Sequence, residues 1–337
     1  MAEEIERETR YYRSFSDDFV ETANQGYELP EDFEWIDDSR AGRAKAAVLR
    51  PIGLLVAKVY SKAALGMRIE NREAILDYQN SCDDGFFVYI NHTQTFNDVV
   101  LPLLMAYPKR AYILISPSNM GIPVLGGLLP AFGALPIPDN LEQTKKLNAA
   151  VKTRIEEGQA VITYPEGHLW PWNTHPRPLQ AAAFTYPVST NRPVFAATTT
   201  YQPRAHHKTP RATVYVDGPF YPDESLPRAR RKEKLRDEVQ AAMQKRSRES
   251  TVEYVRYRPA EGAPALPGVE DEPAAPAAPA GESTRAATPQ DAADQVARCY
   301  ATREPQAREA ASAAAAQVSQ AAQAVTRSPA VQGGDAR

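Results

Sequence analysis

Short runs of apolar residues alternate with longer amphipathic stretches through the middle of the chain. The apolar runs predict buried strands at Phe86–Ile90, Ala111–Ser116, Ala160–Tyr164, Pro193–Tyr201 and Ala212–Val216. The amphipathic stretches predict helices at Asp98–Tyr107, Leu141–Glu157 and Arg228–Ser247. Because strands that alternate with helices form a sheet covered on both faces, we predict an α/β fold whose mostly parallel or mixed sheet is flanked by helices.

The helix predicted at Leu141–Glu157 carries clear signals at both of its ends. Asn140 precedes it as a capping residue, and Gln143 follows three positions later, as a capping box requires. Gly158 stands just after the last helical residue, where glycine commonly ends a helix. This segment therefore has the best-defined boundaries of the predicted helices.

A further amphipathic segment, Ala46–Gly66, precedes the first predicted strand. Arg50, Lys58 and Lys62 interrupt it, so it is too polar to cross a membrane, which takes about 20 mostly apolar residues. On a helical wheel these three cations share one sector, and Val56 and Val59 lie on the other side. The pattern fits a surface helix that docks on the core, and it also fits an interfacial helix that lies on a membrane.

Composition divides the chain into three parts. We expect an acidic extension at residues 1–45, a folded domain at 46–258 and a disordered Ala/Pro-rich tail at 259–337. The tail has few large apolar residues, so it cannot bury enough surface to offset the entropy of ordering it. The remaining stretch is long enough to form one sizeable core.

The formal net charge is only −3, but the region 204–258 is basic. This basic region fits a solvated helix face or a surface for anionic lipid, and no nucleic-acid-binding motif accompanies it. The two cysteines, Cys82 and Cys299, form neither a disulfide framework nor a zinc motif. Because residues 1–38 lack the pattern of a signal peptide, we expect a cytoplasmic protein, peripheral at the inner membrane face.

Two short polar segments, Asn91–Asp98 and Tyr164–Trp172, each follow a predicted strand. Ligands bind at the carboxyl ends of strands in open α/β sheets, so these segments are candidates for one shared site. His92 and Asp98 can meet if His92 closes the strand and Asp98 opens the next helix, and a carboxylate-held His is a general base. Alternatively, Asp98 only caps the helix and His92 makes a turn hydrogen bond. A metal site that combines His92, His168 and His175 with Asp98 or Glu166 is a further alternative, but its spacing matches no metal signature.

These residues resemble the signatures of the glycerolipid acyltransferases, which acylate glycerol 3-phosphate and lysophospholipids. The first signature of that family, N-H-x4-D, is similar to Asn91-His92 with Asp98, and the third, F-P-E-G, is similar to Tyr164-Pro-Glu-Gly167. The second and fourth signatures resemble the segments 127–138 and 192–196. The resemblance covers about residues 52–215, which would make the folded domain an acyltransferase-like catalytic domain.

The sequence departs from the pattern of this family at two places. The carboxylate place of the first signature falls on Asn97, and Asp98 comes one residue later. We expect Asp98 to be the partner of His92, because an amide orients a histidine without stabilising its charged form. The second signature lacks its phosphate-binding Arg and has Asp139 there, so we expect Arg177 or Lys145 to replace it, unless the acceptor is less anionic.

The resemblance implies an acyl transfer without a covalent intermediate. His92 would be the general base, supported by Asp98, while Asn91, Glu166, Gly167 and Arg177 would lie around the substrate. The donor would be acyl-CoA or acyl-carrier protein as a co-substrate, with no other cofactor and no metal, and the acceptor a lysophospholipid or glycerol phosphate. Two alternatives stay open: a catalytically weakened lipid-binding protein on the same fold, and a metal-dependent hydrolase.

Overall fold

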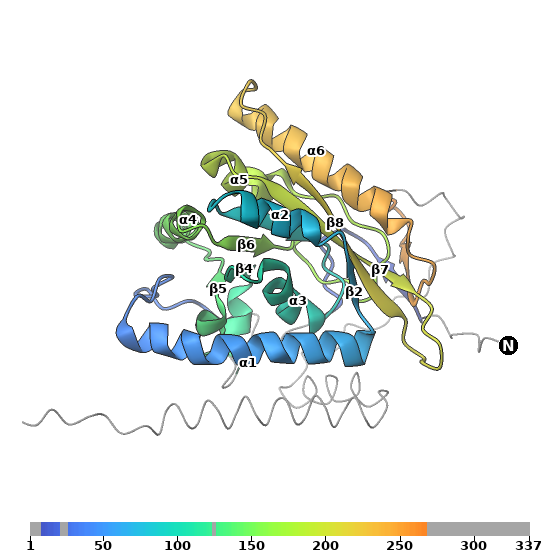
Figure 1. Ribbon diagram of the computed structural model, residues 1–337. Coiled ribbons are helices and arrows are strands. Elements are labelled where there is room, and N and C mark those ends of the chain that lie inside the picture. Colours follow the sequence, from blue (N-terminus) through green and yellow to red (C-terminus); the bar gives the residue numbers. More distant parts are fainter. Residues whose placement is uncertain (1–7, 21–25, 123–125, 268–337) are drawn as a thin grey trace, which may run out of the picture.

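The computed structural model describes residues 8–20, 26–122 and 126–267 (Figure 1). The main sheet has seven strands in the order β2-β8-β7-β3-β6-β4-β5. These strands are β2 (Arg68–Glu70), β3 (Phe86–Ile90), β4 (Ala111–Ile115), β5 (Ala134–Pro136), β6 (Ala160–Thr163), β7 (Val194–Gln202) and β8 (Arg211–Phe220). All neighbours pair in parallel except β7 and β8, which are antiparallel, so the sheet is mixed as predicted.

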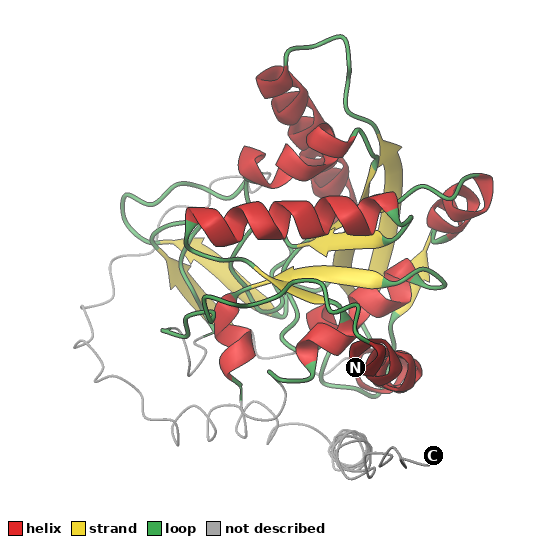
Figure 2. Ribbon diagram, turned by 90° about the vertical axis from the view of Figure 1, so that its left-hand side faces the viewer, coloured by secondary structure: helices red, strands yellow, loops and turns green. Residues whose placement is uncertain are grey.

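Helices cover both faces of this sheet (Figures 1 and 2). They are α1 (Arg40–Leu65), α2 (Glu73–Ser81), α3 (Asn97–Ala106), α4 (Leu141–Glu156), α5 (Thr185–Thr190) and α6 (Arg228–Ser247). One apolar cluster joins α1, α2 and α3 to one face, and a second joins α4, α5 and α6 to the other face. Strands β3 and β6 are buried along their whole length because they lie at the centre of the sheet between these two layers.

All five predicted strands and all three predicted helices are present, with ends that differ by a few residues. Asn140 caps α4 as predicted, because its side chain accepts a hydrogen bond from the Gln143 amide. The short elements β2, α2, β5 and α5 were not predicted, because their few residues carry too little periodic signal. The first helix was also predicted to begin too late: α1 starts at Arg40, where Ser39 caps it.

The predicted boundaries of the folded domain do not coincide with the structural ones. Near the N-terminus, β1 (Glu8–Tyr12) pairs in parallel with β9 (Val255–Pro259), and this small sheet packs on Trp170. Trp35 is buried and donates its indole N–H to the Pro136 carbonyl at 2.9 Å. Leu266, inside the predicted tail, is buried as well. A few apolar side chains thus pack parts of the predicted N-terminal extension and the start of the predicted tail onto the core. Residues 268–337 of the predicted tail lie outside the described residues.

No helix in the described part of the chain is long and apolar enough to span a membrane.

Candidate active site

The imidazole of His92 and the carboxylate of Asp98 meet at the carboxyl end of β3. Asp98 lies in the first turn of α3, and its Oδ2 atom is 2.7 Å from Nδ1 of His92. The side chain of His92 is 23% exposed, whereas that of Asp98 is 2% exposed. Nε2 of His92 has no hydrogen-bond partner among the described residues. Nε2 of His92 is therefore available to a ligand, while Nδ1 is held by the carboxylate of Asp98.

The carboxylate of Asp98 is fixed by the turn that connects β3 to α3. Its Oδ2 atom also accepts hydrogen bonds from the backbone amides of Thr93 and Gln94, at 3.0 and 2.9 Å. Its Oδ1 atom is buried and has no partner among the described residues. Burial raises the pKa of Asp98 above its ordinary value, and the contacts with His92 and the two amides offset this only in part.

Asn97, the other candidate partner of His92, points to a different part of the fold. Its side chain accepts a hydrogen bond from Ser61 of α1 at 3.0 Å and contacts the sulfur of Met67. Neighbouring residues on a helix point about 100° apart, so only one of Asn97 and Asp98 can face the strand end. The packing of α3 on α1 turns Asn97 away and leaves Asp98 toward His92.

Tyr164 supports this pair from the end of β6. Its ring stacks on the imidazole of His92 with a centroid separation of 4.4 Å, and its hydroxyl donates to the Asp98 carbonyl at 2.5 Å. Burial, together with the nearby charge of Asp98, raises the pKa of Tyr164 well above its ordinary value, so the hydroxyl remains a donor. The role of Tyr164 was not predicted from the sequence, because the stacking of its ring on His92 depends on how the two strand ends pack.

Glu166 and Arg177 form a buried ion pair beside His92. The Nη2 atom of Arg177 is 2.8 Å from Oε2 of Glu166, and the side chains are 1% and 0% exposed. Oε2 also accepts from the backbone amide of His92 at 3.3 Å, and Oε1 accepts from the Arg177 amide at 3.1 Å. Both oxygens of Glu166 are thus used within the protein, so in this structure Glu166 holds the backbone of His92 and does not face a substrate.

The environment of Arg177 does not fit the predicted substrate contact. Its guanidinium donates to the carbonyls of Phe15 and His168 and lies over the ring of Trp170, 4.6 Å from the centroid. The residue is fully buried, so it cannot take the place of the missing phosphate-binding Arg without leaving these partners. Lys145, the other predicted substitute, pairs with Glu142 on the exposed surface of α4.

Asn91 and Gly167 have contrasting environments. Asn91 is buried, and its amide exchanges two hydrogen bonds with the backbone of Thr199, at 3.0 and 2.7 Å, so it ties β3 to β7. Gly167 is exposed, and its φ of +80° suits glycine. A Cβ atom there would approach only the amide of Gln180, at 3.9 Å. Of these two predicted contacts, only Gly167 lies where a ligand can approach the backbone.

The loop after Glu166 is tied directly to the residues around His92. The amide of Trp170 donates to the His92 carbonyl at 3.0 Å, and the amide of Trp172 donates to the Thr93 carbonyl at 2.8 Å. The two segments predicted to share a site therefore lie side by side. Within the described residues, no group of three or more His, Cys, Asp or Glu side chains could hold a metal ion.

No family model and no curated protein sequence matches the chain. Its fold is similar to the crystal structure of the 1-acyl-sn-glycerophosphate (LPA) acyltransferase PlsC from Thermotoga maritima. The match has a TM-score of 0.46 and 16% sequence identity, and it covers 64% of this chain and 84% of that chain. Because a match this distant does not carry over chemistry, the functional conclusion rests on the residues around His92.

Proposed function

We propose that the protein is an O-acyltransferase that moves a fatty acyl group from a thioester to a hydroxyl of a glycerolipid or lysophospholipid. The observation that carries this proposal is the pairing of His92 with Asp98, which leaves Nε2 of His92, at the carboxyl end of β3, without a hydrogen-bond partner among the described residues. A hydroxyl needs one general base to attack a thioester, and a histidine backed by a carboxylate is such a base. The signature-like order of the two segments supports the same class.

The proposed reaction uses His92 twice. Nε2 takes the proton of the acceptor hydroxyl while the hydroxyl oxygen forms a bond to the thioester carbonyl carbon. The tetrahedral intermediate then collapses, the carbon–sulfur bond breaks, and the departing thiolate receives the proton from Nε2. Asp98 keeps Nδ1 protonated and stabilises the imidazolium between these steps. The ion pair of Glu166 with Arg177 positions the backbone of His92 throughout.

The test of this proposal is a thiol-release assay on His92→Ala. With acyl-CoA or acyl-carrier protein as donor and lysophospholipid or glycerol 3-phosphate as acceptor, we expect the rate to fall by about 100-fold or more. His206→Ala, which removes an exposed histidine of the β7–β8 loop, is the matched control and should keep wild-type activity. Equal activity of a folded His92→Ala protein would refute the proposed mechanism.

The same assay separates the alternatives. A lipid-binding protein without catalysis would bind lysophospholipid and release no thiol with any donor. A metal-dependent hydrolase would release thiol without an acceptor and lose this activity with a chelator. Release that requires both an acceptor and His92 supports the acyltransferase.

We further propose that α1 rests on an anionic membrane surface and brings the lipid acceptor to this site. The exposed apolar residues Val48, Leu55 and Val59, which are 48%, 60% and 48% exposed, are spaced by seven and four positions and form one stripe. The helix has no Asp or Glu, and its cations are Arg40, Arg43, Lys45, Arg50, Lys58 and Lys62. Apolar side chains flanked by cations are typical of helices that lie in a membrane interface. Val99, the residue after Asp98, is exposed as well, and its helix α3 packs on α1.

Vesicle sedimentation tests this membrane contact. Leu55→Asp should reduce binding to phosphatidylglycerol vesicles by about tenfold or more, since a buried leucine contributes about 1.5–3 kcal/mol and the new charge is repelled. Tyr221→Asp changes a similarly exposed apolar residue beyond β8 and should bind like the wild type. Equal losses in the two variants would contradict a specific role of α1.

A further inference from the structure

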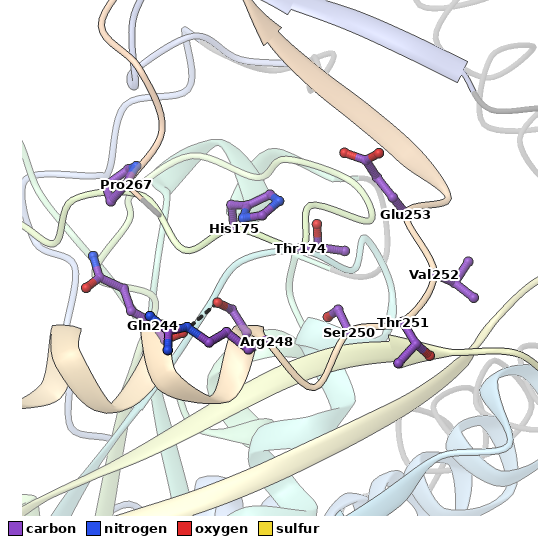
Figure 3. A pocket seen from close by; sticks show the side chains of 10 residues that line it. Thr174, His175, Gln244, Arg248, Ser250, Thr251, Val252, Glu253 and Pro267 are labelled. Atoms are coloured by element: carbon purple, nitrogen blue, oxygen red, sulfur yellow. Dashed lines mark hydrogen bonds between the residues drawn. The ribbon is translucent and has the colours of Figure 1, made fainter. Parts of the chain in front are cut away.

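A polar pocket of about 360 Å³ lies between the C-terminal end of α6 and the loop that follows Trp172 (Figure 3). Its lining includes Thr174, His175, Gln244, Arg248, Ser250 and Glu253. The pocket differs from the site around His92, which shares none of these side chains. It is large enough for a small polar ligand.

Several side chains of this pocket have hydrogen-bonding groups that no described residue uses. Thr174 is buried, yet its hydroxyl has no partner in the described part of the chain. The ring of His175 and the side-chain amide of Gln244 have no such partner either. Ser250 accepts a hydrogen bond from the Tyr201 amide at 3.2 Å through its hydroxyl oxygen, which leaves the proton of that hydroxyl available. Thr174 is the buried member of this set, and because buried polar groups usually have partners, its unpartnered hydroxyl at the pocket indicates a ligand.

The charge in this pocket favours an anion. Arg248 has no ion-pair partner among the described residues, whereas Arg246, two positions earlier, is held by Asp217. Glu253, the acidic residue of the lining, is paired with Arg256, since its Oε2 atom is 2.7 Å from Nε of that residue. The carbonyls of Arg246 and Ser247 at the end of α6 accept from the next turn. Arg248 is therefore the uncompensated charge of the pocket within the described structure.

Hydrogen bonds connect the pocket to the candidate active site. Thr174 lies two residues after Trp172, whose amide donates to the carbonyl of Thr93, the residue after His92. On the other side, Thr251 donates its amide to the carbonyl of Tyr201, whose hydroxyl is 2.7 Å from that of Thr93. Two short paths of hydrogen bonds thus connect the pocket to the turn that carries His92.

We infer that this pocket binds a phosphate group, with the Arg248 guanidinium as its charged ligand and the hydroxyls of Thr174 and Ser250 as further donors. A guanidinium pairs with phosphate oxygens through charge-assisted, often bidentate hydrogen bonds. Arg248 would supply the cation that Arg177 and Lys145 cannot supply. The phosphate belongs either to a lipid head group or to free phosphate. Only the assignment of this phosphate to the acyl acceptor rests on the proposed acyl transfer.

Binding is tested directly by calorimetry with inorganic phosphate and with sn-glycerol 3-phosphate at constant ionic strength. We expect Arg248→Ala to weaken both ligands by about tenfold or more, because a hydrogen bond to a charged group is lost. Lys245 and Arg248 are both exposed, but Lys245 does not line the pocket, so Lys245→Ala removes the same charge and should bind like the wild type. Thr174→Val removes only a hydroxyl and should weaken binding by a smaller factor. Equal binding by wild type and Arg248→Ala would overturn the inference.

Kinetics then identify the source of the phosphate. If it belongs to the acceptor, Arg248→Ala raises KM for a phosphate-bearing acceptor about tenfold and leaves kcat unchanged. If binding is lost but KM is unchanged, the pocket takes free phosphate. His92→Ala should bind phosphate like the wild type, because His92 does not line the pocket. If the wild-type protein binds phosphate through Arg248 but transfers no acyl group, the proposed function is refuted and the phosphate pocket is supported.

Discussion

Removal of the Arg177 side chain tests whether the ion pair beside His92 is a buried structural element. In Arg177→Met, the methionine fills much of the same volume but leaves the carboxylate of Glu166 without its cation. Glu166 is 0% exposed at its side chain, so water cannot easily replace the lost partner. The amides of His92 and Arg177 would remain as its only donors.

The expected loss of stability follows from this burial. Breaking a buried ion pair by removing one partner costs about 3–5 kcal/mol, because an uncompensated charge remains inside. The contact of Arg177 with the ring of Trp170 adds about 0.5–2 kcal/mol. For a domain of this size each kcal/mol corresponds to about 2–4 °C in Tm, so we expect Tm to fall by roughly 7–28 °C.

Urea unfolding followed by circular dichroism measures this loss, and Arg246→Met is the matched control. Arg246 also pairs with a carboxylate, Asp217, at 2.7 Å and also lies over an aromatic ring, that of Tyr215. Its pair is partly exposed, at 26% and 22%, so its removal should cost only about 1 kcal/mol or less. Similar losses in the two variants would refute the reasoning from burial.

A double variant separates the charge from the packing. Glu166→Gln combined with Arg177→Met removes the uncompensated carboxylate, so it should be more stable than Arg177→Met alone. If the double variant loses the sum of the two single losses, Glu166 and Arg177 do not act as a pair.

The remaining predictions concern Asp98. Asp98→Asn should reduce acyl transfer by about 100-fold, because the imidazolium of His92 loses its charged partner. Asn97→Ala should keep turnover and lose only about 1 kcal/mol of stability. If only Asn97→Ala loses turnover, Asn97 and not Asp98 is the partner of His92. Because burial raises the pKa of Asp98 above 3.8, the folded protein binds this proton more tightly than the unfolded chain. Its contribution to stability is complete below pH 3.8 and is lost as the pH rises through the folded pKa, so above pH 3.8 the free energy of unfolding should fall less with rising pH in Asp98→Asn than in the wild type. Identical slopes in the two proteins would contradict the raised pKa.

The sequence by itself determined the strands at the centre of the sheet and the residues that carry candidate chemistry. Phe86–Ile90 and Ala160–Thr163 are uninterrupted apolar runs, and such runs are stable only when both faces of a strand are buried. His92 and Asp98 are six residues apart across one turn, so the sequence allowed them to meet, and the second segment and the family signatures favoured that pairing over a helix cap. Their expected approach at the carboxyl end of β3 is present in the structure.

Only the tertiary structure decided which charged side chains face a ligand. Arg177 looked available for a substrate, but it is buried against Glu166, 11 residues away, and against Phe15, 162 residues away. Arg248 is exposed, as a solvated basic region predicts, and it also lines a pocket. The N-terminal residues looked separable, but β1 joins β9 across almost the whole described chain. The physical reason is the same in each case: periodicity records the burial of apolar side chains, whereas the partner of a charged group depends on contacts between distant segments, which no local pattern encodes.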